Sequence, residues 1–315
     1  MKFIAINGGG TKTEAIIFDE KGCVSGFATG ASSSAISNDI ERMRGHLSAL
    51  LDTLIPVGRE TVDCVYAGIS GAEENEARHN QVKEMLKSFF PGCEQVYVSS
   101  DAMNSFRACI QEGDGVVANV STGSAVFCVR NNTVKQVGGW GYLFGDEGST
   151  FDLGRRAIIA ALREIDGRGS KTLIRSEIES KLGRPLKDEL HAIYQGGRTK
   201  IASFAECLLK AAEKNDRVAC NQLREAARDI GNAIMTAGDQ IDTSLKIVAL
   251  AGAMWKNKTY YNAVDAEVGR HVQLLDPRMP KVFGAAVQAM LCVGKKADNA
   301  FRDAFSNSLK AVQND

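Results

Sequence analysis

Two short loops rich in glycine and hydroxyl side chains are the first candidates for chemistry in this sequence. Residues 7–13 read Asn-Gly-Gly-Gly-Thr-Lys-Thr, and residues 121–124 read Ser-Thr-Gly-Ser, each after an apolar run. Glycine lets backbone N–H groups approach an anion closely, and hydroxyl groups add further donors, so both loops could bind phosphate. The loop 7–13 has neither the spacing of a Walker A loop nor that of a dinucleotide fingerprint. A plain polar turn remains the alternative for each loop.

Two acidic side chains could act on a substrate. Asp101 directly follows a strand-like run, and a carboxylate at a strand end can accept the proton of an attacking hydroxyl. The same residue could instead cap a helix that begins at Ala102. Asp146 lies in the glycine-rich stretch 138–149, and an ionised carboxylate is a strong hydrogen-bond acceptor. Asp146 or Glu147 could also cap the helix that follows.

The sequence predicts an α/β scaffold for these residues, because short apolar runs alternate with helical patterns. We expect strands at 2–6, 14–18, 24–28, 62–69, 95–98, 115–120, 125–129 and 246–250. We expect helices at 39–54, 77–89, 149–165, 171–182, 198–213 and 216–240. The region 150–240 is therefore a helix-rich layer, inserted or appended.

An internal similarity predicts two related halves that face each other. Residues 2–26 and 115–139 both read as strand, Gly/Thr/Ser loop, strand, polar turn and third strand. With 315 residues, two domains are expected. We place the first at 1–114, with the C-terminal helix 298–315 as a candidate addition, and the second at 115–297.

Composition excludes several functional classes. Lys plus Arg and Asp plus Glu are 38 each, which argues against a nucleic-acid-binding face or a basic membrane patch. We find no apolar run long enough for a membrane span and no cleavable signal, so we expect no membrane partner and a cytoplasmic location. The eight cysteines form no CxxC pair and the four histidines lack ligand spacing, which argues against disulfide or zinc frameworks.

The motifs together resemble the sugar kinase, chaperone and actin superfamily. The closer match is the N-acetylglucosamine kinase branch, grouped with the BadF/BadG/BcrA/BcrD ATPases. The resemblance covers nearly the whole chain and rests on GGGTKT (8–13), AGISGAE (67–73), SSDA (99–102), STGS (121–124), GGWGYLFGDEGS (138–149), GRR (154–156) and DGRG (166–169). It implies two actin-like (ribonuclease H-like) domains with a nucleotide and sugar cleft between them.

The resemblance also implies roles for individual residues. Asp101 corresponds to the catalytic base, and Asn7 would contact Mg²⁺ through water. The residues implied in ATP or phosphate binding are Gly9, Gly10, Thr11, Lys12, Thr13, Ser121, Thr122, Gly123, Ser124, Gly252 and Ala253. Those implied in sugar binding are Ser32, Ser33, Asp101, Thr122, Gly139, Trp140, Gly145, Asp146, Ser149 and Thr150. For Gly252 and Ala253, a simple strand-to-helix turn is an alternative.

The implied activity is phosphorylation of an amino sugar by ATP with Mg²⁺, most directly N-acetylglucosamine at its C6 hydroxyl, in a homodimer. Glucosamine and N-acetylmuramic acid are alternative substrates. Four positions depart from the family pattern and bear on rate and sugar identity: Asn7 replaces an acidic residue, Ser121 and Ala253 replace Gly, and Ser33 replaces Asn. A non-catalytic sugar sensor and an ATP-driven activator of a dehydratase are the competing functions.

Overall fold

The computed structural model describes residues 1–314, which form two compact units. Unit 1 comprises Met1–Gly113 and the segment from Pro277 onward, and unit 2 comprises Asp114–Asp276. The sequence analysis assigned 277–297 to the second domain. This segment lies in unit 1 instead, because its helix, Lys281–Cys292, packs against the first strand of that unit.

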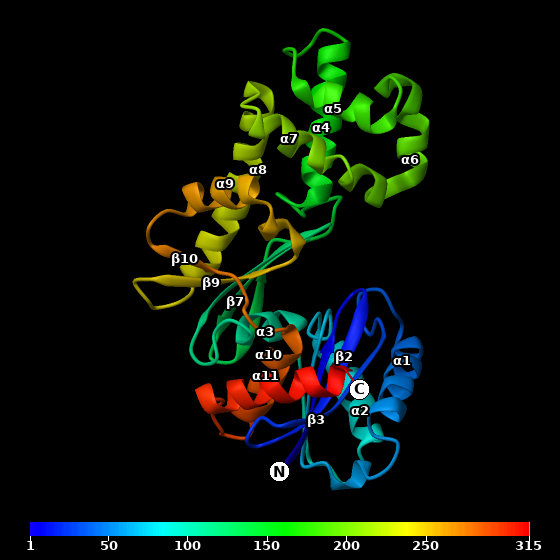
Figure 1. The fold of residues 1–315 in the computed structure, drawn as a ribbon, viewed down its shortest axis with the longest axis vertical. Helices are drawn as coiled ribbons and strands as arrows, with labels where there is room; N and C mark the ends of the chain where they lie inside the picture. Colours follow the sequence, from blue (N-terminus) through cyan, green and yellow to red (C-terminus); the bar gives the residue numbers. More distant parts are fainter. Residues whose placement is uncertain (315) are drawn as a thin grey trace. The chain divides into compact units, whose positions relative to one another are not determined.

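Unit 1, coloured blue to cyan and orange to red in Figure 1, is built on a five-stranded sheet with the order β3-β2-β1-β4-β5. Its strands are β1 (Lys2–Gly8), β2 (Lys12–Asp19), β3 (Val24–Ala31), β4 (Cys64–Ile69) and β5 (Gln95–Ser99). Its helices are α1 (Ile40–Leu54), α2 (Glu76–Phe89), α3 (Asp101–Arg107), α10 (Lys281–Cys292) and α11 (Asn299–Asn314), with a 3-10 turn η1 (Arg59–Thr61). Strand β1 pairs antiparallel with β2 and parallel with β4, so it is the centre of a mixed sheet.

The side chains of β1 alternate between two cores, one on each face of the sheet. Ile4 and Ile6 belong to the core that contains α1 and α2, whereas Phe3 and Ala5 belong to the core that contains α10 and α11. A strand buried on both faces has a continuous apolar sequence, and this explains why residues 3–6 read Phe-Ile-Ala-Ile.

Unit 2 contains a second five-stranded sheet, with the order β10-β9-β6-β7-β8. Its strands are β6 (Gly115–Val120), β7 (Ser124–Arg130), β8 (Thr133–Val137), β9 (Lys246–Ala251) and β10 (Val272–Leu275). Its helices are α4 (Thr150–Ile165), α5 (Leu173–Leu182), α6 (Leu186–Ala202), α7 (Ala205–Glu213), α8 (Arg217–Gly238) and α9 (Lys258–Val268), with a 3-10 turn η2 (Ala253–Lys256).

The two sheets share one topology, as the internal sequence similarity predicted. Strand β6 pairs antiparallel with β7 and parallel with β9, as β1 does with β2 and β4. Parallel neighbours end at the same edge of a sheet, and in open α/β sheets ligands bind beyond the carboxyl ends of the strands. The candidate loops follow β1 and β5 in unit 1 and β6 and β9 in unit 2. Both units therefore present their candidate residues at the same place in the topology.

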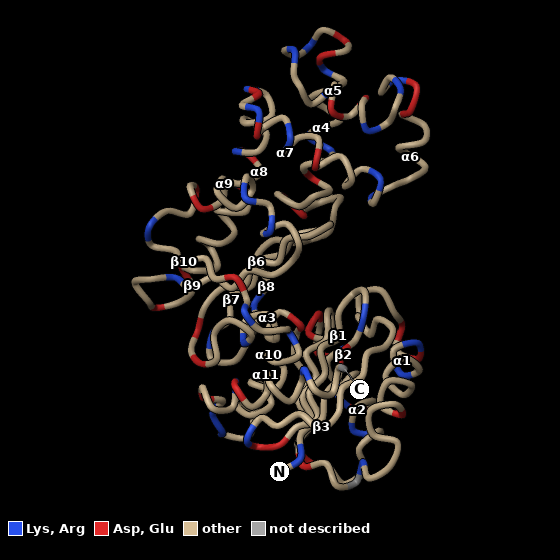
Figure 2. The backbone as a smooth tube through the Cα atoms, viewed as in Figure 1, with Lys and Arg blue, Asp and Glu red and all other residues tan. Residues whose placement is uncertain are grey.

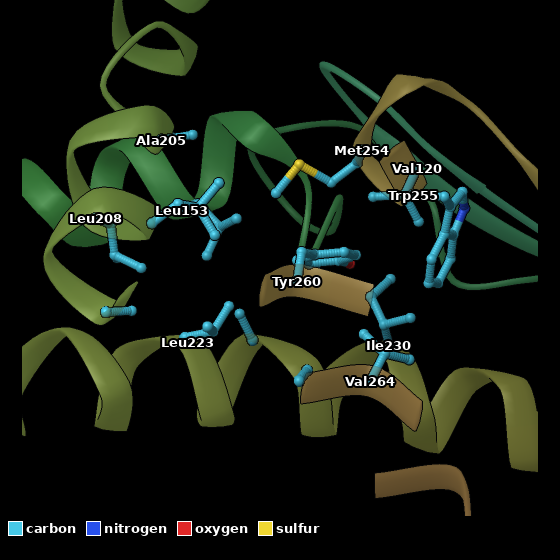
Figure 3. Packing of buried hydrophobic residues seen from close by; sticks show 14 of the residues in the cluster. Val120, Leu153, Ala205, Leu208, Leu223, Ile230, Met254, Trp255, Tyr260 and Val264 are labelled. Carbon is cyan, nitrogen blue, oxygen red and sulfur yellow. The ribbon is translucent and has the colours of Figure 1, made fainter. Parts of the chain in front are cut away.

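The core of unit 2 joins the helical layer to the end of β6. Figure 3 shows Val120 of β6 and Leu153 of α4 in one cluster with Tyr260 of α9. The ring of Tyr260 meets Trp255 edge-on at 5.4 Å between centroids. The Trp255 indole N–H donates to the Ala118 carbonyl at 2.9 Å. These contacts fix the start of α4 relative to the sheet.

The sequence prediction for unit 2 differs from the structure most clearly at α6 and β10. Helix α6 begins at Leu186, whereas the sequence predicts that the helix after 171–182 begins only at residue 198. The reason is local: Gly196 and Gly197 read as a helix stop, and Gly197 does have non-helical φ/ψ angles within α6. Strand β10 has only four residues, too few for a clear alternating pattern.

Charged residues of both signs are interspersed along the backbone (Figure 2), in agreement with equal totals of 38 basic and 38 acidic residues. Within the described part of the chain, no helix has the length and apolar content to span a membrane.

Candidate active site

The loop between β1 and β2 is a tight turn with an exposed tip. Its turn is closed by a hydrogen bond from the Gly9 N–H to the Lys12 carbonyl at 3.0 Å, and Gly10, Thr11 and Lys12 are exposed. Thr13 is different, because it is buried and its hydroxyl donates to the Ala31 carbonyl at 2.7 Å. In this structure, the Thr13 hydroxyl therefore holds β2 to the end of β3 and does not face solvent.

Ser32 and Ser33 connect the end of β3 to the phosphate loop. The Ser32 hydroxyl donates to the Gly9 carbonyl at 2.9 Å, whereas Ser33 is fully buried with its Oγ 2.9 Å from the Thr13 Oγ1. A Cβ atom on Gly8 would lie 2.4 Å from the Ser33 Oγ, so this packing requires glycine at position 8. Ser32 is only half-buried and remains open to a ligand, while Ser33 is packed inside unit 1.

Asp101 is the first residue of α3 and is not its cap. The N-cap is Ser100, whose hydroxyl accepts a hydrogen bond from the Ala102 N–H at 3.2 Å. The alternative that Asp101 caps this helix is therefore wrong. Its carboxylate is 16% exposed and lies 3.6 Å from the Lys281 ammonium group. Burial raises the Asp101 pKa, and Lys281 opposes this shift.

Lys281 reaches Asp101 because α3 and α10 lie side by side. A Cβ atom on Gly284 would lie 1.9 Å from the Asn104 carbonyl oxygen, so the two backbones meet closely at that point. One turn further along, the Arg107 Nε donates to the Gln288 Oε1 at 2.9 Å, and both side chains are buried. No sequence pattern predicts the contact between Lys281 and Asp101, because the two residues lie far apart in the chain.

Glu73, in the loop after β4, holds the end of β5. Its Oε2 accepts hydrogen bonds from the Ser100 N–H at 2.9 Å and from the Ser99 hydroxyl at 3.2 Å. Burial raises the Glu73 pKa, and the donors from Ser100 and Ser99 oppose the shift. Glu73 thus fixes the residue that caps α3, and with it the place of Asp101.

Asn7, predicted to contact Mg²⁺ through water, has both ends of its amide engaged. Its Oδ1 accepts from the Asn104 Nδ2 at 3.0 Å, and its Nδ2 lies 3.5 Å from the Glu14 Oε2. Asn7 and Glu14 are direct cross-strand partners in the β1–β2 ladder. Glu14 also forms an ion pair with Lys12 at 2.5 Å. The carboxylate beside the phosphate loop therefore comes from Glu14, which the sequence analysis did not single out.

In unit 2, the Ser-Thr-Gly-Ser loop is tied to the start of α4. The Thr150 N–H donates to the Ser121 carbonyl at 2.9 Å, while Thr122 is exposed. The Ser124 hydroxyl is turned away from the loop tip and donates to the Glu147 carbonyl at 2.6 Å. Ser121, Thr122 and Gly123 are thus the accessible part of this loop.

The turn after β9 lies against the end of β6. Gly252 has φ +99°, and a Cβ atom there would lie 2.1 Å from the Val120 carbonyl oxygen. Only glycine permits this approach. Because Val120 directly precedes Ser121, unit 2 brings Gly252 and Ala253 beside the Ser-Thr-Gly-Ser loop.

The stretch 138–149 combines an exposed apolar tip with a buried acidic end. Trp140 is 69% exposed, whereas Asp146 is 5% exposed and has φ +57°. Ser149 is fully buried and is the N-cap of α4, since its hydroxyl accepts from the Asp152 N–H at 3.2 Å. The alternative that Asp146 or Glu147 caps this helix is therefore wrong, and Ser149 is a structural residue of unit 2.

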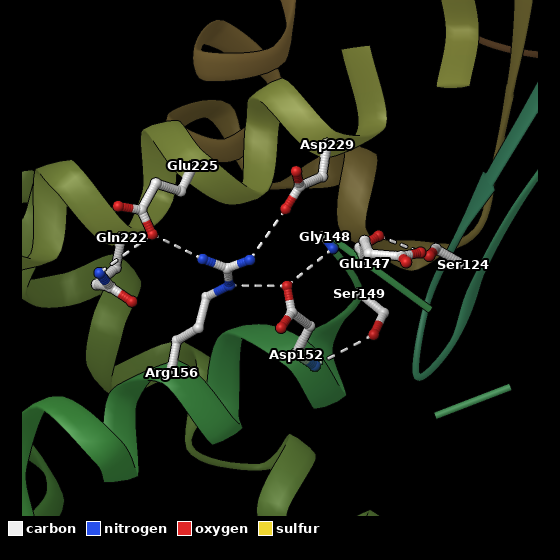
Figure 4. Close-up of polar contacts among 9 residues, drawn as sticks. All are labelled: Ser124, Glu147, Gly148, Ser149, Asp152, Arg156, Gln222, Glu225 and Asp229. Carbon is white, nitrogen blue, oxygen red and sulfur yellow. Dashed lines mark hydrogen bonds and ion pairs between the residues drawn. The ribbon is translucent and has the colours of Figure 1, made fainter. Parts of the chain in front are cut away.

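An ion-pair network fixes the end of this stretch (Figure 4). The Asp152 Oδ2 accepts from the Gly148 N–H at 3.0 Å and from the Arg156 Nε at 2.8 Å. Arg156 also pairs with Glu225 and Asp229 of α8, both at 3.0 Å. Because Arg156 connects α4 to α8, the loop that carries Asp146 is attached to the long helices of unit 2.

Asp146 itself forms an ion pair with Arg198 of α6, at 2.7 Å. The Arg198 guanidinium also lies over the Tyr142 ring, 5.4 Å from its centroid. Burial raises the Asp146 pKa, and the effects of Arg198 and of nearby backbone N–H groups oppose that shift. A carboxylate so placed is a strong hydrogen-bond acceptor. The sequence analysis did not predict Arg198, which lies outside every motif used.

The chain is similar to several known proteins. Residues 4–289 match the model of the BadF/BadG/BcrA/BcrD ATPase family. The chain belongs to this ATPase family. Among curated proteins, it is 31% identical over 307 residues to an N-acetylmuramic acid/N-acetylglucosamine kinase from Clostridium acetobutylicum, covering 92% of this chain and 98% of that protein.

Solved structures of other proteins have the same fold as this chain. A candidate N-acetylglucosamine kinase from Chromobacterium violaceum has a TM-score of 0.68 at 23% identity, covering 90% of this chain and 97% of the other. A ROK family glucokinase from Streptomyces griseus, solved with glucose and AMPPNP, has a TM-score of 0.52 at 17% identity, covering 92% and 99%. The predicted α/β, actin-like fold class is therefore confirmed.

Proposed function

We propose that this protein is an ATP-dependent kinase that phosphorylates an amino sugar, with the C6 hydroxyl of N-acetylglucosamine as the leading acceptor. The observation that carries the proposal is Asp101, a mostly buried carboxylate at the carboxyl end of β5 that caps no helix. The phosphate loop follows the parallel strand β1 in the same unit. The name of the Clostridium acetobutylicum relative supports the choice of sugar.

In the proposed reaction, the Asp101 carboxylate accepts the proton of the sugar hydroxyl. The hydroxyl oxygen then bonds to the γ-phosphorus of ATP, and the bond from that phosphorus to the β,γ-bridging oxygen breaks, so that ADP leaves. Backbone N–H groups of Gly9 and Gly10 and the exposed hydroxyls of Thr11 and Thr122 are proposed to bind the phosphates. Gly252 and Ala253 would lie against the adenosine.

The residues around Asn7 fit a metal that is held mainly by the nucleotide. Mg²⁺ in kinases typically uses one or two carboxylates, water and substrate phosphates. Among residues 1–314, no three His, Cys, Asp or Glu side chains form a metal-binding group, but Glu14 provides one carboxylate beside the loop. Mg²⁺ would neutralise charge on the phosphates. Glu14 would accept hydrogen bonds from its water shell, and Asn7 would orient Glu14.

On the sugar side, Ser32, Trp140, Asp146 and Thr150 are the proposed contacts, with backbone groups of Gly139 and Gly145. Ser33, Thr13 and Ser149 are buried in hydrogen bonds of their own units, so we propose that they support these contacts indirectly. A homodimer remains a prediction from the family resemblance, and a cytoplasmic location remains a prediction from the sequence composition.

The test is an ADP-release assay with MgATP and N-acetylglucosamine, glucosamine and N-acetylmuramic acid, on the parent protein and on Asp101→Asn. Removal of a general base typically lowers kcat about 10²- to 10⁴-fold. Asp303→Asn, which changes an exposed carboxylate on α11, is the matched control and should keep full activity. Sugars that bind without any turnover in the parent protein would overturn the kinase assignment.

A further inference from the structure

Arg198 places a positive charge next to the carboxylate proposed to bind sugar hydroxyls. Its Nη2 lies 2.7 Å from the Asp146 Oδ2, and its side chain remains 39% exposed. A Cβ atom on Gly123 would lie 2.5 Å from that Nη2, so the guanidinium also borders the Ser-Thr-Gly-Ser loop. The charge is therefore at the candidate site and belongs to unit 2 alone.

The backbone conformation at Gly197 positions the Arg198 side chain. Gly197 interrupts α6 with φ +56° and ψ −149°, a conformation that only glycine adopts without strain. Arg198 follows at once, and its guanidinium rests on the Tyr142 ring at 5.4 Å. A planar group supported on one side by an aromatic ring and on another by a carboxylate is held in one orientation.

The Arg198 guanidinium has N–H donors beyond the one that contacts Asp146, and with 39% of the side chain exposed these donors are open to a ligand. Among residues 1–314, the recorded partner of its N–H groups is Asp146, which contacts Nη2. Arginine has five N–H donors and binds carboxylates through two parallel hydrogen bonds. A neutral sugar needs only acceptors and donors for its hydroxyls, for which Asp146 and backbone groups suffice. A second anion would give the remaining N–H groups of Arg198 a partner.

We propose that Arg198 binds a carboxylate on the substrate, so that the acceptors of this kinase include amino sugars that carry an acidic substituent, such as N-acetylmuramic acid. This inference rests on the proposed kinase function. One N–H group of the arginine holds Asp146, which contacts sugar hydroxyls, and the others bind the substrate carboxylate. The same side chain thus orients the hydroxyl-binding group and selects for the acid.

The experiment compares kcat/KM for N-acetylmuramic acid and for N-acetylglucosamine in the parent protein, Arg198→Met, Arg198→Lys and the control Arg155→Met. Arg155 is exposed on α4, so its loss tests the general effect of removing a surface charge. For Arg198→Met we expect a loss of about 10- to 100-fold with the acidic sugar, as for a charged hydrogen-bonding pair. Because Arg198 also holds Asp146, N-acetylglucosamine should lose activity too, but less than the acidic sugar, so the ratio of the two kcat/KM values should fall about 10-fold. Arg198→Lys should be intermediate.

Equilibrium binding of both sugars in the presence of a non-hydrolysable ATP analogue provides a second readout, and thermal unfolding checks that each variant is folded. If the parent phosphorylates N-acetylglucosamine but not N-acetylmuramic acid, the inference fails and the kinase function stands. Equal losses with both sugars in Arg198→Met would also overturn it and leave Arg198 a support for Asp146. If no sugar is phosphorylated by the parent, the proposed function itself fails.

Discussion

Replacing Lys281 by Met should shift the acid limb of the pH–rate profile and leave the plateau in place. Lys281 lies 3.6 Å from the Asp101 carboxylate and is the cation that opposes the effect of burial on its pKa. An opposite charge within about 4–6 Å lowers a carboxyl pKa by about 1–3 units. Because the Lys281 side chain is 36% exposed, solvent screens the pair, and we take the low end, about one unit or ~1.4 kcal/mol.

The direction of this shift follows from the proposed role of Asp101 as the base. Asp101 must be ionised to accept a proton, and loss of Lys281 makes ionisation harder, so its pKa rises further. The acid limb of kcat should therefore move up by about one pH unit. Below the limb, the rate should fall about 10-fold, while above it the rate should equal that of the parent protein.

The assay is ADP release under saturating substrates over a series of pH values. Lys281→Arg should retain the parent profile, and Lys296→Met, which removes a lysine paired with Glu112 on the surface of unit 1, should have no effect. An unshifted acid limb in Lys281→Met would refute the electrostatic argument. A uniform loss at every pH would instead mean that Lys281 contacts the phosphates.

Three further predictions follow from contacts described above. Glu14→Gln should raise the Mg²⁺ concentration for half-maximal rate several-fold, because it removes the carboxylate beside Asn7. Asn7→Asp should lower that concentration, because a second carboxylate would then face the hydrated Mg²⁺; a Mg²⁺ titration at fixed ATP checks both. Burial raises the Asp101 pKa above its usual 3.8, so the protonated carboxyl group favours the folded state. Its contribution to the free energy of unfolding is present at low pH and is lost as the pH rises through the pKa of the folded state. Asp101→Asn should therefore gain stability over the parent as pH rises from about 4 to 7 in urea unfolding, and a constant difference would contradict this. Gly197→Ala should cost about 1–3 kcal/mol and lower Tm by several degrees, because φ is +56° there, while Gly45→Ala, with open space around its Cβ position, should not lower Tm.

Most of the scaffold could be predicted from the sequence, because strands and helices follow from local patterns of apolar residues. The apolar run 3–6 predicts a strand buried on both faces, and β1 is such a strand. The repeated strand–loop–strand pattern predicts two sheets of the same topology, which the structure contains. Asp101 was predicted at a strand end, and it lies two residues after Ser99, the last residue of β5.

Such local patterns do not predict contacts between residues that are far apart in the sequence. Lys281 reaches Asp101 only because α10 returns to unit 1, and Arg198 reaches Asp146 only because Gly197 breaks α6. Hydroxyl groups were also hard to assign, since a serine or threonine that could bind a ligand can equally satisfy a buried backbone group. Thr13 and Ser149 do the latter, and nothing in their sequence neighbourhoods distinguishes them from Thr11 and Thr122.

The division of unit 1 into two chain segments has a consequence for how the protein folds during synthesis. Unit 2 is one continuous stretch, Asp114–Asp276, so it can complete its core as soon as it leaves the ribosome. Unit 1 cannot, because Phe3 and Ala5 of the first strand are covered by α10 and α11, which follow unit 2 in the chain. Until these helices are made, the apolar side chains on one face of its sheet lack their cover. Proteolytic removal of α10 would return unit 1 to this incomplete state, and with it the lysine beside Asp101 would be lost.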